Sequence, residues 1–453
     1  MIPAPRNRYA DLLRVLAIGM VVLGHWLLTS IRYSGGQLSG VSAMSDISWS
    51  GWGTLLFQVM PVFFLVGGYA NSLSWAQHHA DGATWAWWVR HRAIRLLRPT
   101  TVYVAVIVIA VAISRLAGVS MAELAQAGWA IAIQLWFLPV YLLLIALTPA
   151  LHAAHRRWGL AVPVVFALGA SAVDAGILGA GLAWIGYLNY LLVWGSMHQW
   201  GFAWRDGMLT RSRWRPYALA AGGGAVLAGL LAWSPFPVNM VGTTAVGVNN
   251  TIPPSVALLA FAAVQAGLLL AAEPVMSRLL ARAARLWRCV TWLNDRVLTV
   301  YLWHMVPVVI VAVAFYPSGV LAQPAVGSAA WWALRPAWIA ALAIVLVPAA
   351  VWLARFEQPL RRRPAAQPGS GTAAQPGSGT SAQPARGPAA LRAALVAVGV
   401  GAAGVALARI TIGGFAPGGD VPVGTIAAYA CGVILTLGAG WVASGMTVVE
   451  RPA

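Results

Sequence analysis

Apolar stretches of about 20 residues recur along the chain and are separated by short polar segments. About 20 apolar helical residues cross the hydrocarbon core of a bilayer, so each stretch predicts a membrane-spanning helix. Ten core spans are expected near residues 10–30, 52–73, 99–117, 129–150, 159–178, 182–200, 216–234, 255–273, 297–316 and 337–355. The predicted fold class is all-α, a polytopic transmembrane helix bundle.

The pattern changes after the tenth span. Residues 364–388 repeat Gln-Pro-Gly-Ser-Gly-Thr-Ala-Ala with a period of eight, a composition that behaves as a flexible tether. Two further apolar runs, near 390–408 and 424–446, predict a C-terminal two-helix hairpin that packs on the bundle or binds a partner. The expected organisation is a transmembrane domain over 1–363, a Pro/Gly/Ser-rich repeat linker over 364–388 and a transmembrane hairpin over 389–453.

Composition supports a membrane protein. Of the 453 residues, 60% are hydrophobic and 9% charged, and the mean hydropathy is +0.75. The net charge of +18 comes from arginines, which cluster in the loops on one side of the predicted bundle. This clustering indicates membrane topology rather than nucleic-acid binding. We expect a multi-pass protein of the plasma membrane, in contact with membrane lipid, with its N-terminus in the cytoplasm and no nucleic-acid partner.

The first span carries ionisable side chains, which are costly in hydrocarbon and normally face a protein or water-filled interior. Arg14 and His25 are eleven positions apart, about three helical turns, so both emerge from one face about 16 Å apart along the axis. Asp11 lies on nearly the same stripe. This arrangement predicts a polar reaction chamber. The structural alternatives are a histidine satisfied by a neighbouring helix, and an arginine that pairs with Asp11 or reaches the headgroups.

Six motifs follow one another in an order that resembles the integral-membrane acyltransferase 3 family. Arg14 and His25 match the family's Arg, ten residues, then His. The other five are Pro61-Val-Phe-Phe-Leu-Val-Gly67-Gly-Tyr69, in which Gly67 replaces the usual Ser or Thr, Arg90-His91-Arg92, Trp136-Phe137-Leu138, Tyr301-Leu-Trp-His304-Met305 and Phe356-Glu357-Gln-Pro359. The resemblance covers about residues 5–363 and excludes the C-terminal hairpin.

The resemblance implies transfer of an acyl group, often acetyl, from cytoplasmic acyl-coenzyme A to a hydroxyl of a carbohydrate or glycolipid acceptor. His25 suits this reaction, because an imidazole can take the proton of an attacking hydroxyl or accept the acyl group itself. Arg14 would bind a coenzyme phosphate or polarise the thioester oxygen, and Asp11 would orient either residue. These three are the expected catalytic residues.

Five residues are expected to bind the donor: Arg90, Arg92, Arg95, Glu357 and His304. Coenzyme A carries a 3′-phosphate and a diphosphate, which arginines recognise. The basic run also fits an interfacial helix bound to anionic lipid, His304 also fits a buried packing role, and Glu357 a capping role. The sequence has no metal-binding motif, so no metal is expected.

A transporter is the alternative function, with His25 and Arg14 in a proton or anion pathway. Transporters often show repeated halves with broken spans in matching positions. No such internal symmetry is visible in this sequence, and the basic run and the motif order favour the enzyme.

Overall fold

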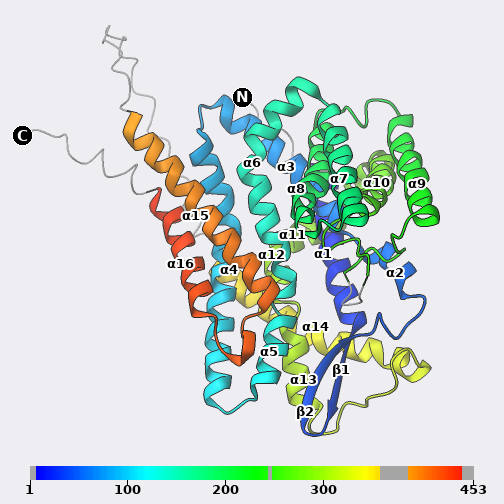
Figure 1. Ribbon diagram of the computed structural model, residues 1–453, viewed down its shortest axis with the longest axis vertical. Helices are drawn as coiled ribbons and strands as arrows, with labels where there is room; N and C mark the ends of the chain where they lie inside the picture. The colour runs from blue at the N-terminus through cyan, green and yellow to red at the C-terminus, as the bar shows by residue number, and fades with distance from the viewer. Residues whose placement is uncertain (1–6, 243–246, 358–385, 441–453) are drawn as a thin grey trace, which may run out of the picture.

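The structure is a computed structural model that describes residues 7–242, 247–357 and 386–440, and its helices form one bundle (Figure 1). The repeat segment predicted over 364–388 lies almost wholly outside the described residues, as does the end of the span predicted over 424–446. The helices are α1 (Arg8–Leu28), α2 (Ser50–Phe57), α3 (Met60–Ala80), α4 (Trp85–Leu116), α5 (Met121–Ala130), α6 (Phe137–Trp158), α7 (Ala161–Ala180), α8 (Tyr187–Arg205), α9 (Trp214–Trp233), α10 (Val256–Arg282), α11 (Ala284–Asn294), α12 (Val297–Trp303), α13 (Val306–Phe315), α14 (Ala329–Glu357), α15 (Arg386–Gly413) and α16 (Val423–Gly438), with short 3-10 turns at Ile133–Trp136, Ala183–Gly186 and Pro417–Gly419.

Nine helical segments of the described chain are long and apolar enough to cross a membrane, and α12 with α13, bent by 41°, makes a tenth. This confirms the predicted all-α polytopic bundle. Helix α8 has 19 residues but is not among the apolar spans. Its polar residues Asn189, Ser196, His198 and Gln199 are fully buried, so α8 turns its polar side into the bundle.

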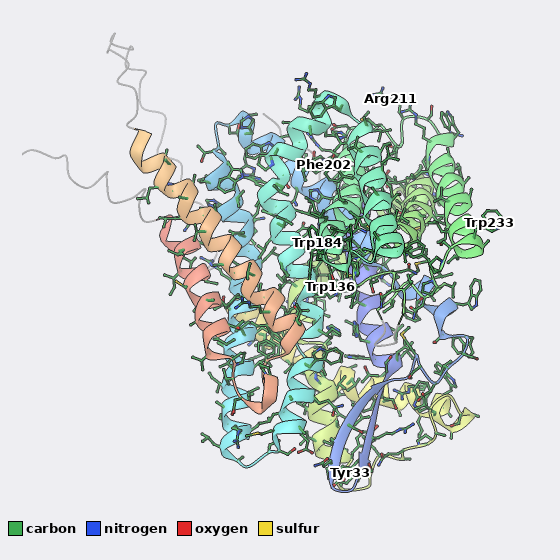
Figure 2. All side chains as sticks on the ribbon, viewed as in Figure 1. Tyr33, Trp136, Trp184, Phe202, Arg211 and Trp233 are labelled. Atoms are coloured by element: carbon green, nitrogen blue, oxygen red, sulfur yellow. The ribbon has the colours of Figure 1, made fainter. Side chains whose placement is uncertain are left out.

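The bundle has two distinct ends, which Figure 2 marks with Arg211 at one and Tyr33 at the other. We call the first the arginine end. The opposite, strand end carries an antiparallel pair, β1 (Thr29–Ser34) and β2 (Gln37–Ser42), in register from Thr29 with Ser42 to Ser34 with Gln37. Gly35 and Gly36 make the turn with φ of 59° and 81°, a conformation that glycine adopts without strain.

Helix α4 begins well before the span predicted at 99–117. The Thr84 hydroxyl caps its first turn by accepting a hydrogen bond from the Trp87 amide at 3.3 Å, and the helix continues through Pro99. Proline is tolerated inside membrane helices because neighbouring groups satisfy the freed backbone. The run from Arg90 to Arg98 therefore lies on the first turns of α4 and not in a loop.

Helices α3 and α8 touch through glycines. A methyl carbon added at Gly68 would lie 1.9 Å from the His198 carbonyl oxygen, and one added at Gly201 would lie 2.2 Å from the Leu65 carbonyl oxygen. Only glycine permits backbones this close, as is common where membrane helices cross. The crossing brings Asn71 of α3 against His198 of α8.

The C-terminal hairpin, α15 and α16, lies against α4 and α6 on the side of the molecule away from α9 (Figure 1). Its two helices pack closely at Gly399 and Gly432. The Tyr429 hydroxyl lies 3.0 Å from that of Thr101, and the Phe415 amide donates to the Gly128 carbonyl at 3.2 Å. The hairpin is thus an integral part of the bundle.

Candidate active site

Helix α1 presents Arg14 and His25 to the interior of the bundle. The Asn7 side chain starts the helix by accepting from the amides of Tyr9 and Ala10 at 3.0 and 3.1 Å. Leu16, which is 53% exposed, is nine residues from His25 and so lies about 180° around the helix from it. His25 is half-buried and therefore faces away from the exposed side of α1.

His25 lies in the last turn of α1 and meets His304 at the bend between α12 and α13. The centroids of the two imidazole rings are 5.2 Å apart, with 58° between the ring planes. The indole of Trp26 donates to the carbonyl oxygen of His304 at 2.7 Å, which ties the bend to α1. This histidine pair is the central feature of the candidate site.

The hydrogen bonds of His304 fix its protonation pattern. Its Nδ1 lies 2.7 Å from the Tyr301 carbonyl oxygen, and because a carbonyl only accepts, Nδ1 must donate. In the neutral ring Nε2 then carries a free lone pair. This nitrogen is buried and has no hydrogen-bond partner among the described residues, so it is free to accept a proton or a hydrogen bond.

Arg14 lies nearer the arginine end of the same face. Its Nη1 donates to Asp11 at 3.4 Å and to the side chain of Asn294 at 3.1 Å. The pair with Asp11, which is buried, matches the structural alternative for this arginine. Its side chain nevertheless keeps 26% of its surface exposed, so the guanidinium still has surface available to a ligand.

Arg92 is the arginine of the basic run that contacts α3. It donates a hydrogen bond to Asn71 Oδ1, and the Asn71 amide nitrogen lies 3.1 Å from His198 Nε2. Tyr141 and Arg14 are among the groups whose charges act on Arg92. Two guanidinium groups from different helices thus lie within electrostatic range of each other, which suits a ligand with more than one phosphate.

The other predicted donor-binding residues are placed differently. Arg90 Nε and Nη2 donate to the carbonyls of Thr436 and Leu437, both at 3.0 Å, and so cap the last turn of α16. Arg95 is exposed on α4. Glu357 is the last residue of α14, and its side chain lies outside the described part. Arg14 is thus among the charges that act on Arg92 and not among those that act on Arg90.

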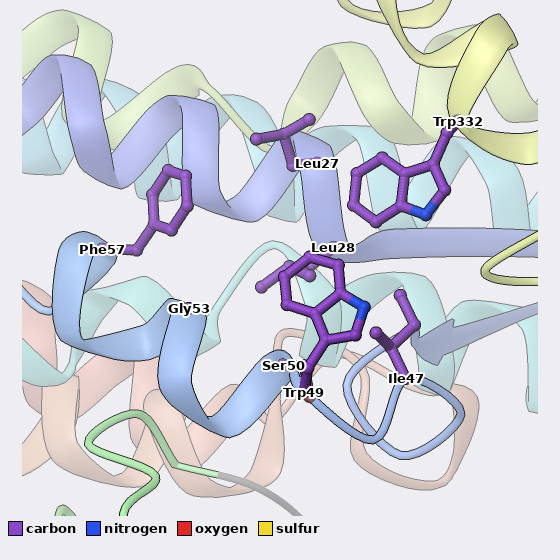
Figure 3. A pocket seen from close by; sticks show the side chains of 8 residues that line it. All are labelled: Leu27, Leu28, Ile47, Trp49, Ser50, Gly53, Phe57 and Trp332. Carbon is purple, nitrogen blue, oxygen red and sulfur yellow. The ribbon is translucent and has the colours of Figure 1, made fainter.

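A small apolar cavity of about 40 Å³ lies beside the last turn of α1, at the strand end (Figure 3). Leu27 and Leu28 of α1 form one wall of the cavity, and Phe57 of α2 lines it as well. Trp49 and Trp332 stack over it with ring centroids 5.7 Å apart. Trp49 is 55% exposed. An aromatic surface is thus open to ligands a few residues from His25.

Three polar contacts were missed from the sequence: Asn71, Tyr141 and Asn294. A signal was present for Asn71, an amide within a predicted span, which is costly unless it is hydrogen-bonded. Tyr141 gave no signal, because tyrosines are common in membrane helices. No three His, Cys, Asp or Glu side chains of the described chain gather as a metal site would require.

The comparisons with known proteins agree with the resemblance in the motifs. A family model described as an acyltransferase domain, acyltransferase 3, matches residues 7–355, which is more than half of the chain. No curated protein and no solved structure matches. The family match favours the enzyme over the transporter alternative. This chain belongs to the acyltransferase 3 family and is a multi-pass membrane acyltransferase.

Proposed function

We propose that the enzyme transfers an acyl group, acetyl in the first instance, from cytoplasmic acyl-coenzyme A to a hydroxyl of a sugar, glycan or lipid-linked acceptor. The observation that carries the proposal is the pairing of His25 with His304, on the same face of α1 that presents Arg14 to Arg92. The face links a phosphate-binding region to a proton acceptor about 16 Å away.

The orientation in the membrane follows from the arginines. Short loops rich in arginine stay in the cytoplasm during insertion. We therefore assign the arginine end to the cytoplasm, together with the N-terminus, and the protein to the plasma membrane. Donor then approaches from the end where Arg92 lies, and the acceptor approaches from the strand end.

Donor binding would use the two interior arginines. The phosphates of coenzyme A dock on Arg92 and Arg14, while Asn71 holds the Arg92 guanidinium in place. The pantetheine arm follows the inner face of α1, and the thioester arrives at His25. No metal takes part in this scheme.

In each route His25 moves one proton from the acceptor hydroxyl to the thiolate that leaves the donor. In the base route His25 takes the proton of the acceptor hydroxyl, the oxygen attacks the thioester carbonyl, and the carbon–sulfur bond breaks. The proton then passes from His25 to the leaving thiolate. In the carrier route an imidazole nitrogen of His25 attacks the thioester carbonyl, the carbon–sulfur bond breaks and the leaving thiolate takes the ring proton. The acceptor hydroxyl then attacks the acyl-imidazole and its proton returns to the ring. In both routes the free Nε2 of His304 supports the positive charge that develops on His25.

The general test is transfer of a labelled acetyl group. Purified full-length enzyme in lipid nanodiscs is incubated with acetyl-labelled coenzyme A and membrane glycolipid extract, and the products are analysed by mass spectrometry. Label on an acceptor hydroxyl is the expected result. Hydrolysis to free acetate alone, or no turnover of any acyl-coenzyme A, contradicts the proposal.

Arg92→Gln is expected to raise the KM for acyl-coenzyme A by about 10–100-fold, because a charge-assisted hydrogen bond to phosphate is lost. The KM is measured with the acceptor at saturation. Arg211→Gln removes the same charge from an exposed site at the same end and should leave the KM unchanged. An equal KM in both variants would show that Arg92 does not bind the donor.

Trp49→Ala is expected to raise the KM for the acceptor by about tenfold, the effect of losing one large contact in an apolar pocket. The KM for the donor should stay the same, because Trp49 lies at the opposite end. Trp233→Ala, at a tryptophan that is 89% exposed on α9, is the matched control. A changed donor KM with an unchanged acceptor KM contradicts this assignment of the two ends.

A further inference from the structure

A buried arginine of α14 lies against the end of α1. Arg335 is 9% exposed, and none of the ion pairs between described residues includes it. By contrast, the exposed residues Arg32 and Arg115 both form ion pairs with aspartates. Burying a cation without a carboxylate is costly, so other groups must compensate the charge of Arg335.

The compensation comes from two carbonyls and one aromatic ring. Nη1 of Arg335 donates to the carbonyl oxygen of Thr29 at 2.9 Å and to that of Trp26 at 3.5 Å. Trp26 lies in the last turn of α1 and Thr29 is its C-cap, where carbonyls without helical partners carry negative partial charge. The guanidinium carbon also lies 3.7 Å from the centroid of the Trp331 ring. Arg335 therefore caps the C-terminal end of α1.

A second donor of α14 reaches the same carbonyl. The indole of Trp338 donates to the Trp26 carbonyl oxygen at 3.1 Å, so this oxygen accepts from two side chains of one helix. The indole of Trp26 in turn donates to the carbonyl oxygen of His304 at 2.7 Å. Because Trp26 directly follows His25 in the chain, a shift at the end of α1 would move His25 relative to His304.

We propose that Arg335 is a positioning residue for acyl transfer. With Trp338 it fixes the carbonyl of Trp26. Trp26 then holds His25 against His304, at the observed 5.2 Å between ring centroids. The inference rests on the proposed function, in which this histidine pair carries the chemistry. A misplacement of about 1 Å can lower the rate of an enzyme by about 10²-fold, so the capping of α1 bears directly on turnover.

The kinetics of Arg335→Met test the proposal. Methionine fills similar space but removes the charge and the donors. With full-length enzyme in nanodiscs, acetyl-labelled coenzyme A and membrane glycolipid extract, we expect kcat to fall by about 10–100-fold. The KM for acetyl-coenzyme A should stay unchanged, because Arg335 does not contact the donor phosphates. A residue that only stabilised the bundle would lower the unfolding temperature without this split between kcat and KM.

A conservative variant and a matched control accompany this measurement. Arg335→Lys should restore most of kcat, because one nitrogen of Arg335 makes both carbonyl contacts and an ammonium group can donate in its place. Arg32→Met removes an exposed arginine of β1 and should leave kcat unchanged. Trp338→Phe removes only an indole N–H and should lower kcat by about three- to tenfold, the equivalent of one hydrogen bond. It also serves if Arg335→Met does not fold.

A double variant tests whether Arg335 acts through the histidine pair. Residues that act as one unit give non-additive effects, whereas the effects of independent sites multiply in the rate. Arg335→Met combined with His304→Gln should therefore lower kcat by less than the product of the two separate effects.

Four outcomes would overturn the proposal. The first is an unchanged kcat in folded Arg335→Met, and the second is an equal loss in Arg335→Lys, which excludes the carbonyl contacts as the cause. The third is a fall of both kcat and the affinity for the donor. The fourth is a double variant that multiplies the separate effects. An inactive His25→Ala beside a fully active Arg335→Met rejects this inference alone, whereas full turnover in folded His25→Ala rejects the proposed function itself.

Discussion

His25→Ala is expected to lower the rate of acyl transfer by about 10²–10⁴-fold, the usual contribution of a general base, and to abolish transfer if His25 carries the acyl group. The effect should fall on kcat, because the phosphates of the donor bind at Arg92. His304→Gln should lower kcat less, since it removes the supporting nitrogen and not the base. Both rates are measured with labelled acetyl-coenzyme A in nanodiscs.

The matched control is His91→Ala, at an exposed histidine on α4, which should turn over like the wild type. Thermal unfolding must show that His25→Ala is as stable as the wild type, so that lost activity reports chemistry. Full turnover in a folded His25→Ala enzyme would refute both routes. A labelled acyl-imidazole trapped on the wild type without acceptor selects the carrier route.

Gly68→Ala is expected to destabilise the protein by about 1–3 kcal/mol or more, the usual cost of overpacking a close contact. The new methyl group would lie 1.9 Å from the His198 carbonyl oxygen, so α3 and α8 must move apart. That movement separates Asn71 from His198 and releases the support of Arg92. We expect a lower unfolding temperature together with a higher KM for the donor.

Gly19→Ala provides the comparison for this substitution. Gly19 lies in the membrane helix α1, and an added methyl carbon there meets nothing within 4 Å. The change should leave unfolding temperature and activity close to those of the wild type. If Gly68→Ala unfolds at the same temperature as Gly19→Ala, the backbones of α3 and α8 do not touch as described.

Much of the fold follows from hydropathy, because each apolar run must be buried or face lipid. The pattern could not give the start of α4, since the arginines before Pro99 lowered the local hydropathy although the helix begins at Trp85. The hydropathy pattern also did not predict β1 and β2, because these strands are short. A separate signal was present, since alternating residues on both sides of Gly35-Gly36 are typical of a tight hairpin. A signal for the bend at His304 was present in the sequence, because Pro307 in the first turn of α13 has no amide to donate to the end of α12.

The candidate site was predictable along one helix and not between helices. The spacing of Arg14 and His25 placed both on one face of α1 because helical geometry is regular. The approach of His304, Arg92 and Asn294 depends on packing between distant segments, which spacing cannot show. Gly67 illustrates the same limit, since a methyl carbon added there would lie 2.6 Å from the Tyr141 ring. The ring explains why this chain has no Ser or Thr at that position.

The hydrogen bond from Arg90 to Thr436 joins residues 346 positions apart. At a synthesis rate of about 5–20 residues per second, Thr436 is made about 20–70 s after Arg90. During that interval Arg90 lacks the two carbonyls that accept from it in the folded protein. Docking of α15 and α16 therefore follows the synthesis of the helices before them, and a chain that stalls before α15 would leave this face of α4 without its cover.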